Sequence, residues 1–394
     1  MNEMRVLRNV LLPVIHPGAR RPGPTTVRTD AGIGRCRGPY AGVCRRIRMR
    51  SSCAMWLLPA AFVSLGESAA GASPLAPGEL RAAIEKSLPL LEETAVGTSE
   101  HRGCFTCHGH AMPVLAMVEA QRRGFLIDVA SLRDQLDHTV EDLKRGRERY
   151  LEGRGQGGGF IRAGYALWML DEAGWKPDDI TGVVSGYLVH DQKADHWRNT
   201  ANRPPTEISD FTATFLALRS LDGYGTAGQQ DRISERRRRA AAWLKRTKGK
   251  ETEDSVFRLL ALRQVNAGKE EIADAVRELQ VAQRPDGGWS QLPGAGEKSD
   301  PYATGTVLYA LNRAGGMAAN HKSYERGVRY LLETQYEDGS WYVKSRSKPF
   351  QTYYESGYPH EKDQFVSMAA GSWATLALLF AAGDGPGRGQ VVAP

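Results

Sequence analysis

Two cysteines and a histidine in the stretch GCFTCHGH, residues 103–110, have the spacing that most directly indicates chemistry in this chain of 394 residues. Cys104 and Cys107 are three positions apart, and His108 follows the second thiol directly. In a c-type haem site two such thiols each form a thioether with a vinyl group, and the adjacent imidazole ligates the iron. The motif therefore predicts haem c bound covalently by Cys104 and Cys107, with His108 as the iron ligand.

Other interpretations of this motif differ in how well they fit. A Cys104–Cys107 disulfide is the main alternative, because two thiols in an oxidising compartment rarely both stay free. A zinc site is disfavoured, since the two cysteines, His108 and His110 are too crowded to surround a metal tetrahedrally. Thioredoxin-like chemistry lacks its βαβ pattern. A five-coordinate haem and one with a distal ligand are equally compatible, and the candidate distal donors are Met117, Met169, Met317, Met368 and His360.

The N-terminal region has the layout of a secretory signal. We interpret residues 1–48 as an over-extended reading frame or disordered leader, and residues 49–72 as a signal peptide, because basic residues precede an apolar run and a small-residue cleavage pattern ending at Ala72. That run is too short to span a bilayer, and no other segment is long and apolar enough. We therefore expect an exported, periplasmic or extracellular protein without a transmembrane segment, whose only mature thiols are those of the motif.

The formal charge of +7 does not predict nucleic-acid binding. Residues 1–72 contain eleven Arg, no Lys and three acidic residues, so residues 73–394 carry about −1. A near-neutral body offers no broad positive surface to a phosphate backbone. The arginine run at residues 236–239 precedes apolar residues at helical spacing, and we interpret it as a solvated helix face.

The sequence predicts a single domain at residues 73–383 that is built from alternating kinds of helix. Six apolar stretches rich in Ala, Leu and Tyr alternate with six amphipathic ones, and strand-like alternation is scarce. The predicted fold class is all-α: an α/α toroid of about six helical hairpins, with the apolar helices in an inner ring and the amphipathic helices in an outer ring. An open solenoid is the alternative. Residues 384–394 are expected to form a disordered tail.

Two junctions between helices carry the same turn signature, QRPDGGW at residues 283–289 and QYEDGSW at residues 335–341. The Asp-Gly pair turns the chain, the Gln amide can bond carbonyls at a helix end, and the Trp packs the turn against the next helix. A weaker third copy is QKADHW at residues 192–197. We interpret all three as structural.

These turns resemble those of the squalene cyclase and prenyltransferase repeat proteins, over roughly residues 77–383 and most specifically over residues 270–383. The segment 343–378 is also similar to exported bacterial members of that superfamily. The resemblance implies an α/α toroid with an apolar central cavity for an isoprenoid or other apolar ligand. It does not fix the activity.

The acid that squalene and hopene cyclases use is altered in this chain. Those enzymes protonate an alkene with the central Asp of an Asp-x-Asp-Asp-Thr motif, and residues 300–304 here read Asp-Pro-Tyr-Ala-Thr. Asp300 matches, but Tyr302 stands in place of a carboxylic acid, and tyrosine, with a pKa of about 10, is a poor acid for an alkene. Asp300 and Tyr302 remain candidate catalytic residues, and we expect no squalene cyclisation.

Prenyltransferase-type zinc chemistry is also disfavoured, because the mature chain has no cysteine outside the motif. A lone pair such as His360 and Asp363 more often forms a local hydrogen bond than a metal site. The side chains expected to line the ligand pocket are Trp168, Tyr302, Tyr353, Tyr354, His360, Asp363 and Trp373.

We therefore expect an exported toroid that binds an isoprenoid or other apolar ligand, in which haem c supplies a redox role and implies a redox partner. The alternative is a haem-free binding or scaffold toroid closed by a Cys104–Cys107 disulfide. Whether the protein is an enzyme does not follow from the sequence.

Overall fold

The computed structural model describes residues 75–190, 194–349 and 352–383, all within one compact unit that runs from Gly71 to Pro394. The predicted leader (1–48), signal peptide (49–72) and C-terminal tail (384–394) lie outside the described residues. Within the described ranges the chain is helical and forms no strand, so the prediction of an all-α fold is confirmed.

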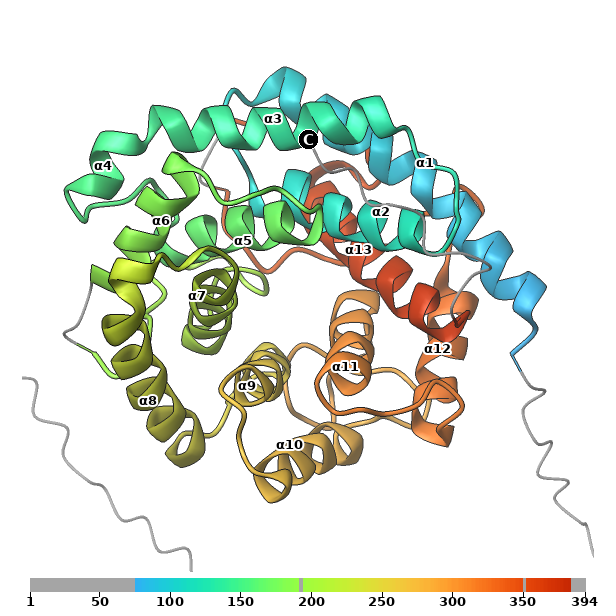
Figure 1. Cartoon of the computed structure of the whole chain (residues 1–394). Helices are drawn as coiled ribbons and strands as arrows, with labels where there is room; N and C mark the ends of the chain where they lie inside the picture. Colours follow the sequence, from blue (N-terminus) through green and yellow to red (C-terminus); the bar gives the residue numbers. More distant parts are fainter. Residues whose placement is uncertain (1–74, 191–193, 350–351, 384–394) are drawn as a thin grey trace, which may run out of the picture. The chain divides into compact units, whose positions relative to one another are not determined.

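Six helices form a closed inner ring in the described part of the chain (Figure 1). Each contacts its neighbours in chain order, and the last also packs against the first. Their apolar sequences suit this position, because a helix covered on all sides presents no face to water. The inner helices are α2 (Met112–Arg122), α5 (Gly159–Glu172), α7 (Asp210–Tyr224), α9 (Thr252–Gln264), α11 (Pro301–Arg313) and α13 (Gln364–Ala381).

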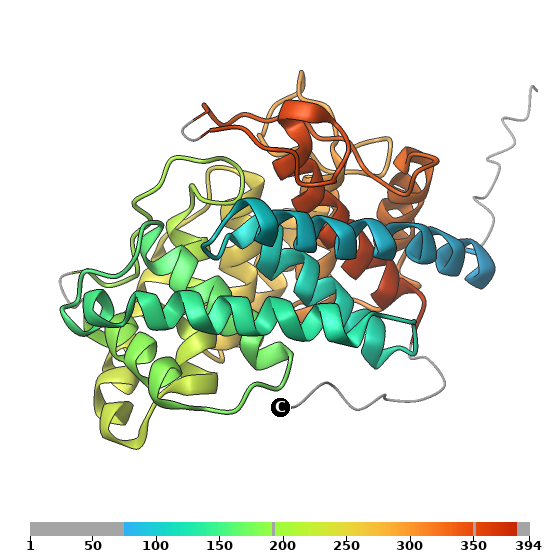
Figure 2. The same cartoon turned by 90° about the horizontal axis from the view of Figure 1, so that it is seen from above.

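Amphipathic helices cover the outside of this ring, and α1 and α3 lie side by side over α2 (Figure 2). The outer helix of the second hairpin is divided at Gly146 into α3 and the short α4. The six hairpins of the predicted toroid are therefore present in the described residues. The outer helices are α1 (Pro77–His101), α3 (Val129–Arg145) with α4 (Arg147–Leu151), α6 (Asp179–His190), α8 (Gln230–Arg246), α10 (Lys269–Val281) and α12 (Lys322–Thr334).

Helix α13 is buried over most of its length. Gly305 of α11 permits close packing, since a Cβ there would lie 2.7 Å from the backbone carbonyl carbon of Trp373. With the preceding turn, Glu361–Ala381 is the one described helical segment long and apolar enough to cross a membrane, yet 89% of its most apolar window is buried inside the protein. Such burial is typical of a core helix.

The turn at residues 283–289 has the structural role predicted for it. Gln283 Nε2 donates to the backbone carbonyls of Gly287 at 2.8 Å and Ser323 at 2.7 Å. Trp289 is fully buried and donates through Nε1 to the Leu279 carbonyl at 2.7 Å. The turn thereby ties the end of α10 to the start of α12.

The copy at residues 335–341 joins the end of the ring to its beginning. Gln335 Nε2 donates to the Ala83 carbonyl of α1 at 2.9 Å. Gly339, with φ of 88°, lies so close to α1 that a Cβ would overlap the Lys86 carbonyl oxygen. Trp341 is fully buried and donates to the Leu331 carbonyl at 2.8 Å. The outer layer is therefore closed as well, which excludes the open solenoid.

The prediction of a solvated face for residues 236–239 is wrong in part. Arg236 is 2% exposed, lies 4.0 Å over the Trp197 ring and donates to the Ala194 carbonyl at 3.2 Å. Arg238 alone matches the expectation, with a side chain 72% exposed. The long apolar stem of arginine lets such a residue cover a buried tryptophan.

Candidate functional site

The cysteine motif lies where the chain enters the inner ring. Residues Cys107–Ala111 form a π-helical turn, η1, that leads directly into α2. Thr106 caps this turn, because its Oγ1 accepts a hydrogen bond from the Gly109 N–H at 3.1 Å. Gly109 permits close packing, since a Cβ there would lie 2.5 Å from Cγ2 of Thr98 in α1. Both thiols of the motif are free, so the alternative disulfide is not formed in this structure.

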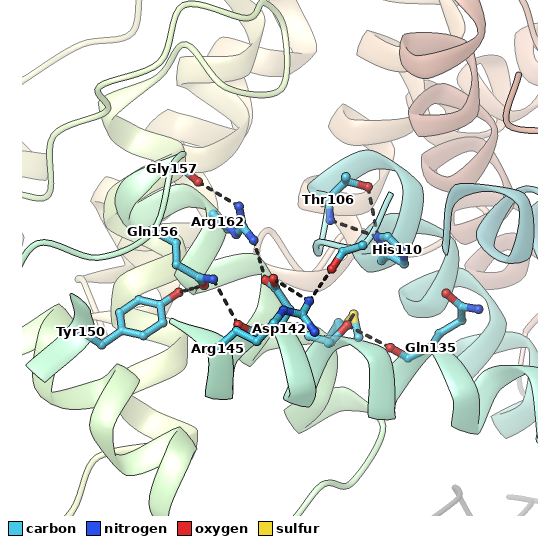
Figure 3. A network of polar contacts seen from close by, with 12 residues as sticks. Thr106, His110, Gln135, Asp142, Arg145, Tyr150, Gln156, Gly157 and Arg162 are labelled. Carbon is cyan, nitrogen blue, oxygen red and sulfur yellow. Dashed lines mark hydrogen bonds and ion pairs between the residues drawn. The ribbon is translucent and has the colours of Figure 1, made fainter. Parts of the chain in front are cut away.

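His110 holds the turn from inside the protein (Figure 3). Its Nδ1 accepts a hydrogen bond from the Thr106 backbone N–H at 3.0 Å, so Nε2 carries the proton and lies 3.1 Å from Ser99 Oγ. Ser99 in turn donates to Gln135 Oε1 at 2.9 Å. Burial, together with the His138 ring stacked 4.8 Å away, lowers the pKa of His110 to about 3. The neutral ring thus links the turn at Cys107–Ala111, hereafter the cysteine turn, to α1 and α3.

A charged network fixes the residue before the first cysteine (Figure 3). Arg145 of α3 donates to the Gly103 backbone carbonyl and, at 3.0 Å, to Asp142 Oδ1. The second carboxylate oxygen of Asp142 accepts from Arg162 of α5 at 2.5 Å. Asp142 has a side chain only 3% exposed, so removing either arginine leaves a buried carboxylate short of a partner.

Replacing His110 by alanine should lower the free energy of opening of the cysteine turn by about 1–3 kcal/mol, because the Thr106 N–H loses its buried acceptor. His110→Asn keeps an acceptor near the position of Nδ1 and should recover part of the loss. Hydrogen exchange at the Thr106 amide measures the effect, and it should be slow in the wild type, fast in His110→Ala and intermediate in His110→Asn. His321→Ala, at an exposed histidine, is the control. Equal exchange in all four proteins would contradict this positioning role.

His108 contributes to the wall of a cavity of about 460 Å³. Its Nε2 is buried and has no hydrogen-bond partner, and its ring meets that of Phe365 edge-on at 5.4 Å. Burial is the largest cause that lowers the pKa of His108 to about 4, and the positive charges of Arg203 and Arg102 contribute in the same direction. The imidazole is therefore neutral at pH 7, with a nitrogen lone pair available to a ligand.

The cavity is bounded by the cysteine turn, two loops and the start of α13. Its volume lies within the range of pockets that hold drug-sized ligands, about 300–1,000 Å³. Positive side chains outnumber negative ones among the lining residues, and prolines, Phe365 and Val366 provide apolar surface. The charged lining residues are Arg203, Lys348, Lys362, Glu207 and Asp363.

The thiol of Cys107 is not activated for redox chemistry of its own. Burial raises its pKa well above the ordinary value, and the nearby Glu207 raises it further. Reactive cysteines instead have a lowered pKa and an electropositive, partly exposed surrounding. Cys107 is 4% exposed and interacts electrostatically with Glu207 and Arg203, which both line the His108 cavity.

Four of the predicted pocket residues lie in the segment before α13, and they divide into two groups. Tyr353 and Asp363 line the His108 cavity, whereas Tyr354 and His360 are not among its lining residues. His360 Nε2 lies 2.9 Å from Ser340 Oγ. Within the described residues, no three His, Cys, Asp or Glu side chains converge to hold a metal ion.

Aromatic side chains fill the centre of the ring, where an apolar cavity was expected. Trp168 and Trp373 are at most 2% exposed, and their ring centroids are 6.1 Å apart. Tyr309 contacts both, at 6.1 and 5.1 Å. The two tryptophans therefore belong to the core, and the His108 cavity is lined by other residues.

Asp300 and Tyr302, the candidate catalytic residues, are placed at the start of α11. Asp300 caps this helix, since its Oδ1 accepts from the Ala303 N–H at 3.0 Å, and burial raises its pKa to about 6. Tyr302 is 1% exposed and donates its hydroxyl to Glu253 Oε2 at 3.1 Å. Neither residue lines the His108 cavity.

Glu253 is a buried acid that the sequence analysis missed. It is 3% exposed, and its other carboxyl oxygen accepts from Thr212 at 3.0 Å. Burial raises the pKa of Glu253 to about 8, so the group is mostly protonated at pH 7. In the sequence it lies in an acidic first turn, ETED at residues 251–254, which is indistinguishable from ordinary helix capping. Glu253 does not line the His108 cavity.

Sequence comparison finds similarity over part of the chain. Residues 249–388 match the squalene-hopene cyclase C-terminal domain. Lanosterol synthase ERG7 of Saccharomyces cerevisiae is 32% identical over 117 residues, which are 29% of this chain and 15% of the relative. Lanosterol synthase erg7A of Aspergillus fumigatus is 34% identical over 105 residues, 27% of this chain and 13% of the relative. The chain thus spans less than a sixth of the curated relatives it matches.

Two similar solved structures cover nearly the whole domain. Both are type II terpene cyclase MstE variants from Scytonema, one in complex with the product merosterolic acid A and the other with the substrate geranylgeranyl dihydroxybenzoate. Each has a TM-score of 0.50 and 14% identity, and covers 78% of this chain and 98% of that one. At this identity the likeness establishes the toroid fold alone.

Proposed function

From the premise that this chain is a squalene cyclase-like toroid, we propose that it is an exported protein that carries haem c at the His108 cavity and binds an isoprenoid or other apolar ligand. The observation that carries the proposal is the neutral His108 imidazole, whose Nε2 is buried without a partner beside a cavity of about 460 Å³. A buried polar atom without a partner is costly, and a ligand would satisfy it.

The motif and the positive side chains match the proposed group in residue type, although neither cysteine lines the His108 cavity in the folded chain. His108 would ligate the iron, and Cys104 and Cys107 would hold the macrocycle through thioethers. Arg203, Lys348 and Lys362 line the cavity and could pair with the two carboxylates of the haem. When bound, haem supplies one-electron redox chemistry, which implies an electron donor or acceptor as partner.

Attachment must precede folding in this proposal. Each thioether forms when a thiol S–H adds across a vinyl C=C bond, so the sulfur gains a bond to carbon and the hydrogen passes to the other vinyl carbon. In the folded chain Cys107 is 4% exposed, its pKa is raised, and neither cysteine lines the cavity. The Cys107 thiol is therefore reachable only while the cysteine turn is open, whereas Cys104 is partly exposed in the folded chain.

The apolar ligand and the absence of squalene cyclisation are proposed on separate grounds. The fold is shared with cyclases whose structures hold isoprenoid substrate or product, which supports a ligand of that class. Tyr302 stands in the place of the expected acid, and Glu253, the buried carboxylic acid beside it, lines no part of the His108 cavity. These placements support binding or redox chemistry rather than alkene protonation.

Expression with cytochrome c maturation proteins should yield a protein with a Soret band and covalent haem on a stained denaturing gel. The double variant Cys104→Ala, Cys107→Ala should lose all covalent haem, because each thioether needs its thiol. His108→Ala should retain the pigment but shift the Soret band. His321→Ala should behave as the wild type. A colourless wild type whose mass is two hydrogens below that of the reduced chain would favour the haem-free toroid with a disulfide.

A further inference from the structure

We infer that a groove at the end of α12 binds a neutral oligosaccharide, a ligand separate from those proposed for the His108 cavity. The groove has a volume of about 820 Å³, near the upper end of the range of about 300–1,000 Å³ for pockets that hold drug-sized ligands. It is formed by the loop before α11, the end of α12, the start of the turn at 335–341 and the segment after that turn. None of the described residues that line it also lines the His108 cavity.

Two tyrosine rings are left uncovered in this groove. Within the described residues only three Phe, Tyr or Trp side chains are exposed, and two of them, Tyr336 at 51% and Tyr342 at 40%, line the groove. The face of an aromatic ring carries partial negative charge, so it attracts the polarised C–H bonds on one face of a sugar ring. A tyrosine offers this contact area at a low cost in conformational entropy.

Both rings are held in place by neighbouring side chains. Each contacts the His360 ring, with centroids 5.2 Å apart for Tyr336 and 5.3 Å apart for Tyr342. The Tyr342 hydroxyl donates to Asp363 Oδ2 at 2.9 Å, and His360 Nε2 lies 2.9 Å from Ser340 Oγ. Because these contacts order the rings before a ligand arrives, less entropy is lost on binding.

The polar side chains of the groove suit a ligand with many hydroxyls and no charge. Gln291, Ser299 and Thr334 line it, and amides and hydroxyls can both donate to and accept from sugar hydroxyls. Arg346 Nε donates to Gln291 Oε1 at 2.8 Å, which fixes the direction of that amide. Three negative and three positive side chains also line the groove, so its charge selects neither a cation nor an anion. These are Glu297, Asp300, Glu333, Lys298, Lys344 and Arg346.

Isothermal titration calorimetry of the purified protein tests the inference with four neutral probes: cellohexaose, maltohexaose, mannohexaose and xylohexaose. At least one should bind at millimolar concentration or below. Tyr336→Ala and Tyr342→Ala should each weaken that binding about tenfold, because each removes a ring on which a sugar can stack. Tyr336→Phe keeps the ring and should recover most of the affinity. Leu126→Ala, at an apolar side chain that is 97% exposed and lies outside the groove, should bind as the wild type.

Circular dichroism of each variant separates lost binding from lost folding, and the hexamers of glucosamine and galacturonate serve as charged comparisons. The inference would be overturned if none of the four neutral sugars bound, or if a charged hexamer bound more tightly than all of them. Equal affinities in the wild type and both folded alanine variants would place the sugar outside this groove and overturn it as well. Each of these outcomes leaves haem attachment intact, whereas a colourless protein that binds a neutral sugar would overturn only the proposed function.

Discussion

Replacing Trp341 by alanine should lower the free energy of unfolding by about 3–5 kcal/mol or more, the range measured for buried Trp and Phe truncations. Trp341 is fully buried, and its Nε1 donates to the Leu331 carbonyl at 2.8 Å. Truncation leaves a large cavity at the turn that joins the end of the ring to α1, and it leaves the Leu331 carbonyl with only the weaker hydrogen bond from Thr334 Oγ1 at 3.4 Å. Because domains are stable by only about 5–15 kcal/mol, much of the protein should be lost to unfolding or aggregation.

Urea unfolding followed by circular dichroism measures this loss. Tyr336→Ala is the matched control, because Tyr336 belongs to the same turn but is 51% exposed. An exposed side chain of this kind typically contributes within about 0.5 kcal/mol. Similar unfolding midpoints for the two variants would show that the turn does not hold the ring together.

The variant Glu253→Gln should remove a large part of the dependence of stability on pH. Burial is the main cause of the raised pKa of Glu253, which is about 8 against 4.5 for an exposed glutamate. Between these two values the unfolded chain has released the proton while the folded chain still holds it. The free energy of unfolding therefore falls as pH rises through this window, by roughly 4 kcal/mol in total, and changes no further above pH 8.

An amide at residue 253 cannot titrate, yet its oxygen can accept from one of the two hydroxyls that contact Glu253, those of Tyr302 and Thr212, while its amino group can donate to the other. Urea unfolding at intervals from pH 5 to pH 9 should show a steep fall for the wild type and a shallower one for Glu253→Gln. A residual slope is expected from Asp300, whose pKa is also raised, to about 6. Glu333→Gln, at an exposed position, should keep the wild-type slope. Parallel slopes for the wild type and Glu253→Gln would mean that Glu253 is ionised in the folded protein.

The sequence was sufficient for the architecture because the fold depends on local patterns repeated along the chain. Apolar stretches that recur with the period of a hairpin indicate a helix buried on all sides, and the Gln-to-Trp turns have a local mechanism that the bonds of Gln283 and Trp289 confirm. Each such pattern is readable within a few dozen residues. The closed ring then follows from six similar units.

The surroundings of the site were harder to predict from the sequence, because they come from segments far apart in the chain. The cavity beside His108 is built in part from loop residues at 203–207, 345–349 and 352–353, which carry no periodic signal. The packing of Trp168 against Trp373 joins residues about 200 positions apart and fills a space that the sequence alone left open. His110 had a weak local signal, a second histidine two positions after the first, but its bonds to Thr106 and Ser99 depend on how α1 meets the turn.

Closure of the ring by its last helix sets an order of events during synthesis. Helix α13 contacts α2, the cysteine turn and α1, and Phe365 at its start packs against His108. A chain that emerges from its N-terminus must therefore make about 250 further residues after His108 before α13 can cover that region. At about 5–20 residues per second this delay amounts to some tens of seconds. The geometry of the toroid thus gives any reaction at Cys107 a time window that ends when α13 arrives.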